Sequence, residues 1–285
     1  MTANRTYNFA DGKSLTLGER TLVMGILNVT PDSFSDGGKW NTRDKMLYHM
    51  EQMVKDGADI IDIGAESSRP GFSVMPAEEE IERLLPFLDA LIPECPVPVS
   101  VDTFKAETAR VAAAHGVHML NDIWGMQYAK EPGTMAAVAA ECGLPIVVMH
   151  NQDSKEYTGD IIDSMKDFFR RSIALADAAG MKRENIILDP GIGFGKTPAG
   201  NVEVLRRQQE LLTIDGEEYP LLLGTSRKSF IGAALDLPVE ERMEATGATC
   251  VIGIMKGAGI VRVHDVKPIA RMCRMTDVIL GQGEE

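Results

Sequence analysis

The chain alternates short apolar runs with longer stretches of helical periodicity. Eight apolar runs, three to six residues long, are spread between positions 22 and 263. Most are continuous and rich in Val, Ile and Leu, the composition of parallel strands buried on both faces. They predict strands at Leu22–Leu27, Ile60–Ile63, Val97–Val101, Val117–Leu120, Ile146–Met149, Ile186–Leu188, Leu221–Leu223 and Ile260–Val263.

Each apolar run is followed by a predicted helix, and several of these helices carry start and stop signals. Asn41 and Thr42 precede one periodic stretch, and Pro76 with three following glutamates places proline and acids in the first turn of another. Gly57, Gly116, Gly143 and Gly180 stand where left-handed helix ends are expected. One predicted helix runs from residue 42 to Asp56, and another begins at Pro76. The others are Lys105–His115, Thr134–Cys142, Asp160–Gly180, Asn201–Leu212, Val239–Gly257 and Pro268–Leu280.

Eight strands alternating with eight helices predict an α/β fold of the (β/α)8 TIM-barrel type, built as a single domain. An open, doubly wound parallel sheet is the competing arrangement. Before the first barrel strand, Thr6–Phe9 and Ser14–Leu17 flank Asp11-Gly12, which predicts a short β-hairpin. Residues 1–18 would then be a hairpin that belongs to the barrel domain and could plug its floor, and residues 19–285 would form the barrel itself.

Composition excludes several classes of partner. The 285 residues include 42 Asp and Glu against 29 Lys and Arg, a formal charge of −13 that repels nucleic acid and anionic lipid. No apolar run approaches the length of a membrane span, and the first residues lack the apolar core of a secretion signal, so we expect a cytoplasmic protein. The four cysteines, at positions 95, 142, 250 and 273, lack zinc-site spacing and are expected to be free thiols.

The predicted chemistry gathers where the apolar runs end. In a TIM barrel the active site lies at the C-terminal ends of the strands, and here every run ends in polar residues. These residues are Asn28, Glu66 to Arg69, Asp102, Asn121 and Asp122, His150 and Asn151, Asp189, Ser226 to Ser229, and Arg262, His264 and Asp265. Because the eight ends would meet on one face, we expect them to form one site.

Two kinds of chemistry can be distinguished in this set. Asp102, Asn121 and Asp189 supply two carboxylates and an amide, which suit the donor edge of a flat, nitrogen-rich heterocycle. Lys228, Arg262 and His264 supply cations that suit phosphate oxygens. Arg262 and His264 stand two apart on a strand, so their side chains share a face.

Three loops add to this picture. Asn28 and the acidic loop that follows could hold Mg²⁺ together with water and phosphate. Residues 30–38 and 67–72 are rich in glycine and serine, carry an aromatic residue each, and predict lids over a substrate. Pro190–Thr197 resembles a P-loop, but proline replaces its first glycine, and Lys196 replaces the last glycine of a dinucleotide fingerprint. We expect its glycines instead to let the loop approach a planar ligand.

Taken together, these motifs resemble the dihydropteroate synthase family over residues 21–280. No single motif is specific, but seven occur in order. They are Gly25–Gly38, Asp62–Gly71, Ser100–Thr103, Asn121–Ile123, Asp189–Phe194, Gly224–Ser229 and Arg262–Val266.

The resemblance implies that 4-aminobenzoate is joined to 6-hydroxymethyl-7,8-dihydropterin diphosphate with loss of pyrophosphate. It implies that the pterin is held by Asp102, Asn121, Asp189 and Lys228, the phosphates by Arg262, His264, Ser68 and Arg69, and Mg²⁺ by Asn28. It also implies that Phe34, Pro70, Phe72, Phe194 and Ser229 lie near the aminobenzoate, and that Lys228, Arg262 and His264 are the catalytic residues. Sulfonamides, which mimic aminobenzoate, are expected to inhibit.

Two positions depart from the family's usual pattern: Ala65 replaces a glycine, and Ser68 replaces a threonine whose hydroxyl it keeps. A pterin-binding methyltransferase barrel is an alternative, but it has no use for a diphosphate site. A paralogue that binds pterin without turnover is another. The family is usually dimeric, and the small and apolar residues of 239–257 and 268–280 offer a flat surface, so we predict a homodimer.

Overall fold

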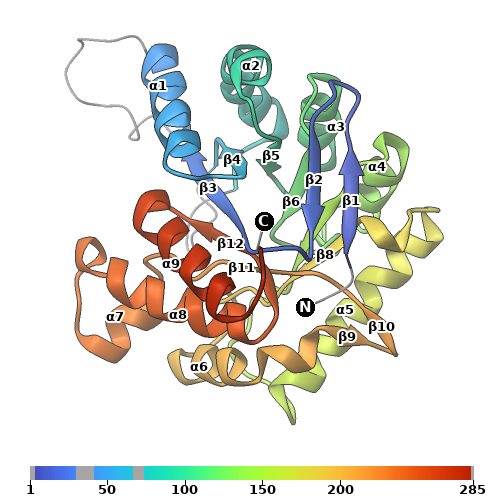
Figure 1. The fold of residues 1–285 in the computed structure, drawn as a ribbon. Helices are drawn as coiled ribbons and strands as arrows, with labels where there is room; N and C mark the ends of the chain where they lie inside the picture. The colour runs from blue at the N-terminus through green and yellow to red at the C-terminus, as the bar shows by residue number, and fades with distance from the viewer. Residues whose placement is uncertain (1–3, 30–41, 67–73, 284–285) are drawn as a thin grey trace.

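A closed barrel of eight parallel strands forms the centre of the molecule (Figure 1). The computed structural model describes residues 4–29, 42–66 and 74–283. Around the barrel the strands are β3 (Leu22–Asn28), β4 (Ile60–Gly64), β5 (Val99–Asp102), β6 (Met119–Asp122), β7 (Ile146–Met149), β8 (Ile186–Asp189), β11 (Leu221–Leu223) and β12 (Ala258–Val263). β12 pairs with β3, so the sheet closes on itself and the predicted TIM barrel is confirmed over the doubly wound alternative.

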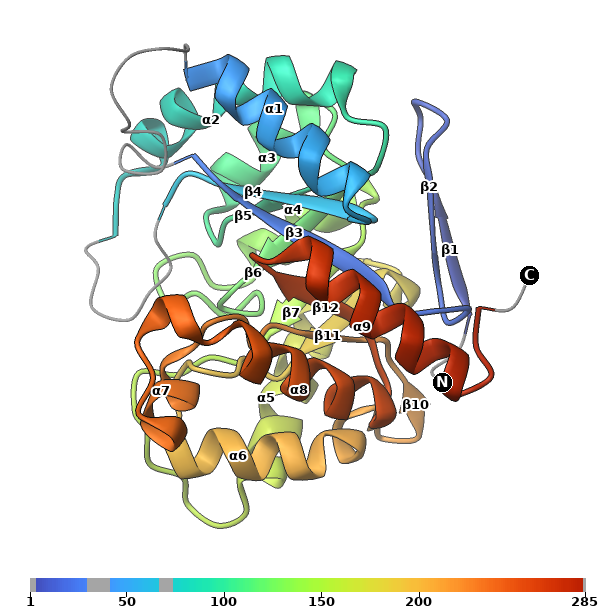
Figure 2. The same cartoon turned by 60° about the vertical axis from the view of Figure 1, so that its left-hand side comes forward.

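Helices cover the outside of the barrel (Figures 1 and 2). They are α1 (Thr42–Lys55), α2 (Ala77–Glu94), α3 (Ala106–Ala114), α4 (Thr134–Cys142), α5 (Ile161–Ala178), α6 (Pro198–Arg207), α7 (Ser229–Leu235), α8 (Met243–Met255) and α9 (Val266–Ile279). Gly57, Gly116, Gly143 and Gly180 all have positive φ angles after their helices, as predicted. The pattern of apolar positions therefore placed every helix except α7.

The structure differs from the sequence prediction in several places. The predicted helix Asn201–Leu212 is α6, which ends at Arg207, followed by a 3-10 turn at Gln208–Leu211. α7 was not predicted, nor was the small hairpin of β9 (Thr213–Ile214) and β10 (Glu217–Glu218). The predicted helix Val239–Gly257 is a 3-10 turn at Val239–Glu241 followed by α8. The break falls at Arg242, whose φ of −98° and ψ of 8° are not helical.

The predicted N-terminal hairpin is present and covers one end of the barrel. β1 (Arg5–Asn8) pairs antiparallel with β2 (Ser14–Leu17), and Figure 2 shows the pair standing across the barrel's end. The buried residues Tyr7, Leu15 and Leu17 pack on the lowest layer of inward side chains. That layer contains Leu22, Met24, Ile60, Met119, Val147, Ile187, Leu222 and Ile260. The expectation that the hairpin plugs the barrel floor is therefore confirmed.

Inward-facing side chains change in character along the barrel axis. The lower layer is apolar, whereas the next inward positions on four of the same strands are Asp62, Asn121, Asp189 and Arg262. On β5, Ser100 pairs with Asp62 at this level. Strand residues alternate in direction, so these polar side chains point into the barrel above the apolar ones. The fold therefore separates an apolar base, which supports stability, from a polar C-terminal end.

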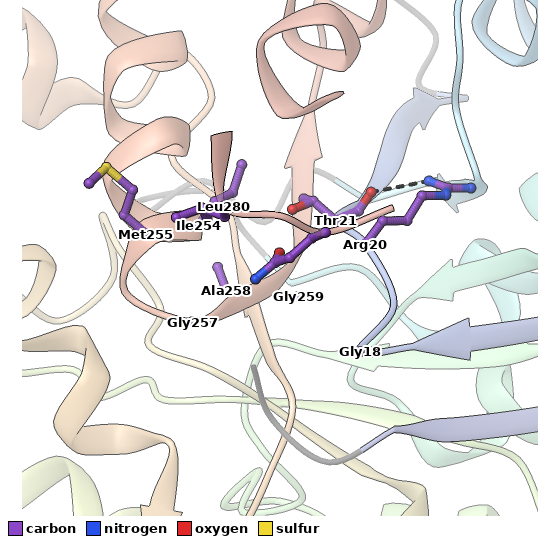
Figure 3. Close-up of a pocket in the computed structure, with 10 residues that line it drawn as sticks. Gly18, Arg20, Thr21, Ile254, Met255, Gly257, Ala258, Gly259 and Leu280 are labelled. Carbon is purple, nitrogen blue, oxygen red and sulfur yellow. Dashed lines mark hydrogen bonds between the residues drawn. The ribbon is translucent and has the colours of Figure 1, made fainter. Parts of the chain in front are cut away.

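A small cavity lies at the opposite end from these polar residues (Figure 3). It measures about 120 Å³ and is formed by residues before β3, at the end of α8, around the start of β12 and after α9. Arg20 is the one charged residue among the described residues that line it, and its guanidinium forms two hydrogen bonds with Asp59. The cavity therefore offers no reactive group.

Among the described residues, no helix is both long and apolar enough to cross a membrane.

Candidate active site

Side chains from five strand ends converge at the polar end of the barrel. Gly224, just after β11, marks the point where they meet, because it leaves space that a larger residue would fill. A Cβ atom placed on Gly224 would lie 3.9 Å from Asp189 Oδ2 and 4.0 Å from both Lys228 Nζ and Arg262 Cβ. The structure therefore brings together the predicted carboxylates and cations that lie far apart in the sequence.

Arg262 is held by two carboxylates across the barrel. Its Nε donates to Asp62 Oδ2 over 2.6 Å, and its Nη2 donates to Asp102 Oδ2 over 2.7 Å. Burial lowers the pKa of Arg262, but Asp62 and Asp102 outweigh that effect and raise it overall, so the guanidinium stays charged. Burial raises the pKa of Asp102, with Arg262 opposing the rise. The site therefore keeps a fixed cation beside a carboxyl group that is easily protonated.

Asp62 is a site residue that sequence reasoning did not single out. It is fully buried on β4, and besides Arg262 it accepts a hydrogen bond from Asn121 Nδ2 over 3.0 Å. Its other oxygen, Oδ1, has no hydrogen-bond partner among the described residues. Asp62 stood inside a recognised motif, but it precedes the strand's end, and its partner Arg262 is 200 positions away in the sequence.

Lys228 and Asp189 form the second charged group of the site. Lys228 Nζ donates to the carbonyl oxygen of Ile192 and lies 4.4 Å from the centre of the Phe194 ring. Burial lowers the pKa of Lys228 to about 8, although Asp189 opposes the shift. Burial also raises the pKa of Asp189, against the effect of Lys228. The ammonium can therefore lose its proton under mildly alkaline conditions.

The glycine-rich loop after β8 is shaped by contacts within the protein. A Cβ on Gly191 would lie 2.0 Å from the carbonyl oxygen of His150, and one on Gly193 would lie 2.8 Å from Lys228 Cδ. Both glycines have positive φ angles. These glycines therefore admit the backbone of His150, just after β7, and the stem of Lys228; that they also allow close approach to a planar ligand stays a prediction.

Lys196 occupies the position where a dinucleotide-binding fingerprint would have its last glycine. Its side chain points back into this loop. Its buried ammonium donates to the carbonyl oxygens of Gly191 and Phe194, each over 3.0 Å, and contacts Nδ1 of His150 over 2.9 Å. Burial lowers the pKa of Lys196 to about 7 and that of His150 well below its ordinary value. The neutral imidazole can therefore accept from the lysine, and the two side chains fix the loop that carries Phe194.

His264 lies on the far side of Arg262 from the barrel base and is positioned by Ser226. The backbone N–H of His264 donates to Ser226 Oγ over 3.1 Å, and the same hydroxyl lies 2.9 Å from Nδ1 of the ring. The hydroxyl hydrogen can then be donated to Nδ1, which leaves the ring proton on Nε2. Arg227, next to Lys228 in sequence, instead pairs with Asp265 over 2.6 Å.

The remaining predicted residues lie at the rim or outside the described residues. Asn28 ends β3 and is exposed, and Ser229 begins α7 and is exposed. Phe194 packs with Phe104, Ile123 and Met149 as an apolar wall. Ser68 and Arg69, and also Phe34, Pro70 and Phe72, lie outside the described residues.

Metal ligands are sparse among the side chains that the structure describes. Nowhere in residues 4–29, 42–66 and 74–283 do three His, Cys, Asp or Glu side chains form a group that could hold a metal ion. The exposed amide of Asn28 is nevertheless a hard oxygen donor, and Mg²⁺ commonly takes one or two protein ligands and completes its shell with phosphate and water. The residues present therefore fit a metal that arrives with a phosphate-bearing substrate.

These features define the class of protein. A TIM barrel with acceptors, cations and an apolar wall at its C-terminal end is an enzyme scaffold for a flat heterocycle that bears anionic groups. The family described as "Pterin binding enzyme" matches residues 24–264. The chain belongs to this family of pterin-binding enzymes and, within it, to the dihydropteroate synthases.

Relatives of known activity and structure support this assignment. The dihydropteroate synthase of Bacillus subtilis (strain 168) is 52% identical over 270 residues, which cover 95% of this chain and 92% of that protein. A Clostridium difficile dihydropteroate synthase, solved in the presence of pteroic acid, is 50% identical with a TM-score of 0.87, covering 92% of this chain and 98% of that one. The Xanthomonas albilineans enzyme in complex with 7,8-dihydropteroate is 34% identical with a TM-score of 0.85, covering 96% and 98%.

Proposed function

We propose that this chain condenses 6-hydroxymethyl-7,8-dihydropterin diphosphate with 4-aminobenzoate at the polar end of its barrel, giving 7,8-dihydropteroate and pyrophosphate. The observation that carries the proposal is the convergence of Asp189, Lys228 and Arg262 on the space beside Gly224. Two carboxylates and an amide oxygen can accept from the N–H groups of the pterin, and Lys228 can donate to its ring acceptors. Arg262 and His264 would donate to the diphosphate.

The reaction is a displacement at the methylene carbon attached to the pterin. The C–O bond breaks and its electron pair goes to the leaving diphosphate, whose growing negative charge is offset by Arg262 and by the Nε2–H of His264. The resulting cation is delocalised into the ring beside the carboxylates Asp102 and Asp189. The amine of 4-aminobenzoate then forms the C–N bond and releases a proton to solvent. Positioning and electrostatics, with no nucleophile from the protein, carry the rate.

The test of this proposal is pyrophosphate release from the pterin diphosphate, measured with and without 4-aminobenzoate. We expect release to depend on both substrates and to match dihydropteroate formation mole for mole. A chain that binds the pterin but releases no pyrophosphate would be the non-catalytic paralogue. Transfer of a methyl group from a folate, with no pyrophosphate formed, would identify the methyltransferase alternative.

We propose that Mg²⁺ is the cofactor and that Asn28 holds it together with the diphosphate. When bound, the ion would neutralise part of the charge that develops on the leaving group. We expect a chelator to lower pyrophosphate release at least about tenfold and added Mg²⁺ to restore it, as the loss of one such electrostatic contact would. Asn28→Ala should raise the Mg²⁺ concentration needed for half-maximal rate. Full activity in excess chelator would contradict the assignment.

Sulfonamides are expected to compete with 4-aminobenzoate. Both are flat para-substituted anilines, and Phe194 and the exposed Ser229 would contact either one at the rim of the pocket. A sulfonamide should therefore raise the KM for 4-aminobenzoate and leave the maximal rate unchanged. Initial rates across a grid of both concentrations provide the measurement. Inhibition that more 4-aminobenzoate does not relieve would contradict a shared site.

We propose a homodimer formed through α8 and α9, which lie side by side (Figures 1 and 2). Together they expose Ile252, Met255, Met275, Val278 and Ile279, each with about half or more of its surface accessible. Exposed apolar surface of this kind commonly marks an interface. Light scattering at micromolar concentration should give twice the 31.0 kDa mass of the chain. A monomeric mass there would contradict the proposal.

We also propose a cytoplasmic location. The four cysteines are free and mostly buried, which supports a reducing compartment.

A further inference from the structure

Asp62 contacts two of the predicted site residues, Arg262 and Asn121, from the middle of β4. One oxygen, Oδ2, accepts from Arg262 Nε over 2.6 Å and from Asn121 Nδ2 over 3.0 Å. The side chain is fully buried on β4. A buried carboxylate is expensive unless it is paired, so this residue is retained at a cost in solvation that its contacts must offset.

The contact with Asn121 determines which end of that amide faces the ligand. A carboxylate only accepts hydrogen bonds, so the group of Asn121 turned toward Asp62 must be its NH2. The amide oxygen of Asn121 is then directed away from Asp62. If the amide were reversed, two oxygens would face each other in a buried site, which is strongly unfavourable.

The contact with Arg262 acts in the same way on a second side chain. With Nε bonded to Asp62 and Nη2 bonded to Asp102, the guanidinium plane is fixed at two of its donors. A planar fork held at two points has little freedom to rotate. Asp62 therefore sets the orientation of one acceptor and one cation in the same pocket.

We propose that Asp62 is a positioning residue that sets the selectivity of the pocket. It would favour a pyrimidine ring with an amino group at position 2 over one with an oxo group at that position. This inference rests on the proposed function. With Asn121 locked, the pocket presents the acceptors Asn121 Oδ1, Asp102 and Asp189 to the heterocycle, and these match the N–H donors of a 2-amino-4-oxo ring. A 2-oxo ring places an acceptor against this row. Without Asp62, the amide of Asn121 can reverse and accommodate it.

The test compares two ligands with the full-length protein: 6-hydroxymethylpterin and its 2-oxo counterpart, 6-hydroxymethyllumazine. Their dissociation constants are measured by calorimetry for the wild type and for Asp62→Asn, which keeps the shape of the side chain. The wild type should prefer the pterin by at least about a hundredfold, since a site built for a donor rejects an analogue that lacks it. In Asp62→Asn this ratio should fall at least about tenfold, the size of one misplaced hydrogen bond.

Two controls separate this role from a general effect on stability. Asp277→Asn makes the same change at the other end of the barrel, where the buried Asp277 accepts from the N–H and hydroxyl of Thr21 over 3.0 and 2.7 Å. It should lower the melting temperature and leave the ligand ratio unchanged. The KM for 4-aminobenzoate should stay within about twofold in Asp62→Asn, because no contact with Asp62 lies at the rim.

A second variant decides the matter if Asp62→Asn does not fold. Asn121→Ala removes the oriented amide and leaves the Asp62–Arg262 pair, and its ligand ratio should also fall at least about tenfold. An unchanged ratio in either folded variant overturns the inference while the proposed function stands. If the wild type binds neither ligand, the proposed function fails and this inference fails with it.

Discussion

Replacing Arg262 with alanine is expected to lower kcat/KM by about a thousandfold or more. Arg262 is the shared partner of Asp62 and Asp102, so its loss leaves two carboxylates facing each other in the barrel. Losing one group that stabilises charge in the transition state costs about a hundred- to a thousandfold in rate, and breaking a buried ion pair on one side also costs about 3–5 kcal/mol of folding stability. The same change removes a cation from the leaving diphosphate, so kcat and pterin binding should both suffer.

The measurement is the rate of pyrophosphate release by Arg262→Ala and by a matched control variant. The control is Arg170→Ala on α5, where the arginine forms exposed ion pairs with Asp167 and Asp215. Exposed pairs contribute little, so this variant should keep wild-type kinetics. Circular dichroism and melting temperature establish that Arg262→Ala is folded at the assay temperature. Retention of more than a tenth of wild-type kcat/KM by a folded Arg262→Ala would refute the role given to this residue.

Lys228→Met is expected to lower kcat/KM by about a hundredfold and to remove an alkaline limb from the pH profile. Burial lowers the pKa of Lys228 from 10.5 to about 8, so the folded protein holds the cation below pH 8 and loses it above. A hydrogen bond from a charged donor is worth about 1.5–3 kcal/mol, which gives the size of the expected loss. In the wild type, kcat/KM for the pterin substrate should therefore fall as pH rises through about 8.

The profile must be compared between variants because other groups of the site also titrate. Burial lowers the pKa of Lys196 to about 7 and raises those of Asp102 and Asp189. Only the limb that belongs to Lys228 should vanish in Lys228→Met, while the contributions of Lys196 and the two carboxyl groups remain. An unchanged alkaline limb in that variant would show that another group controls it, and the assignment would be wrong.

The fold was predictable because its elements follow local rules. Continuous Val, Ile and Leu runs gave the strands, and glycines such as Gly116 and Gly143 marked helix ends with positive φ angles. The missed elements lack such signals. α7 has only seven residues and directly follows the polar end of β11, and β9 and β10 have two residues each. Elements this short have no period to detect, so tertiary contacts decide their form.

The site was predictable only in part. The sequence shows where strands end, but it does not show which side chains contact one another after the barrel closes. Asp102, Asn121, Asp189, Lys228 and Arg262 stood at predicted strand ends, and the structure brings them together. Their individual roles stay predictions. Asp62 and Lys196 act through contacts with residues whose identity depends on barrel closure and loop shape, which no local pattern encodes. The contacts of the glycines in the loop after β8 were unpredictable for the same reason: their neighbours are His150 and Lys228.

The hairpin of β1 and β2 determines the end of the barrel from which ligands can enter and leave. It closes the base of the barrel with Tyr7, Leu15 and Leu17, and the layer of aliphatic side chains above it is equally impermeable to a polar molecule. A ligand held among the polar residues can therefore enter and leave only from the C-terminal end of the barrel. On the proposed function, the pterin diphosphate would have to bind before 4-aminobenzoate, and the product would have to leave from the same end.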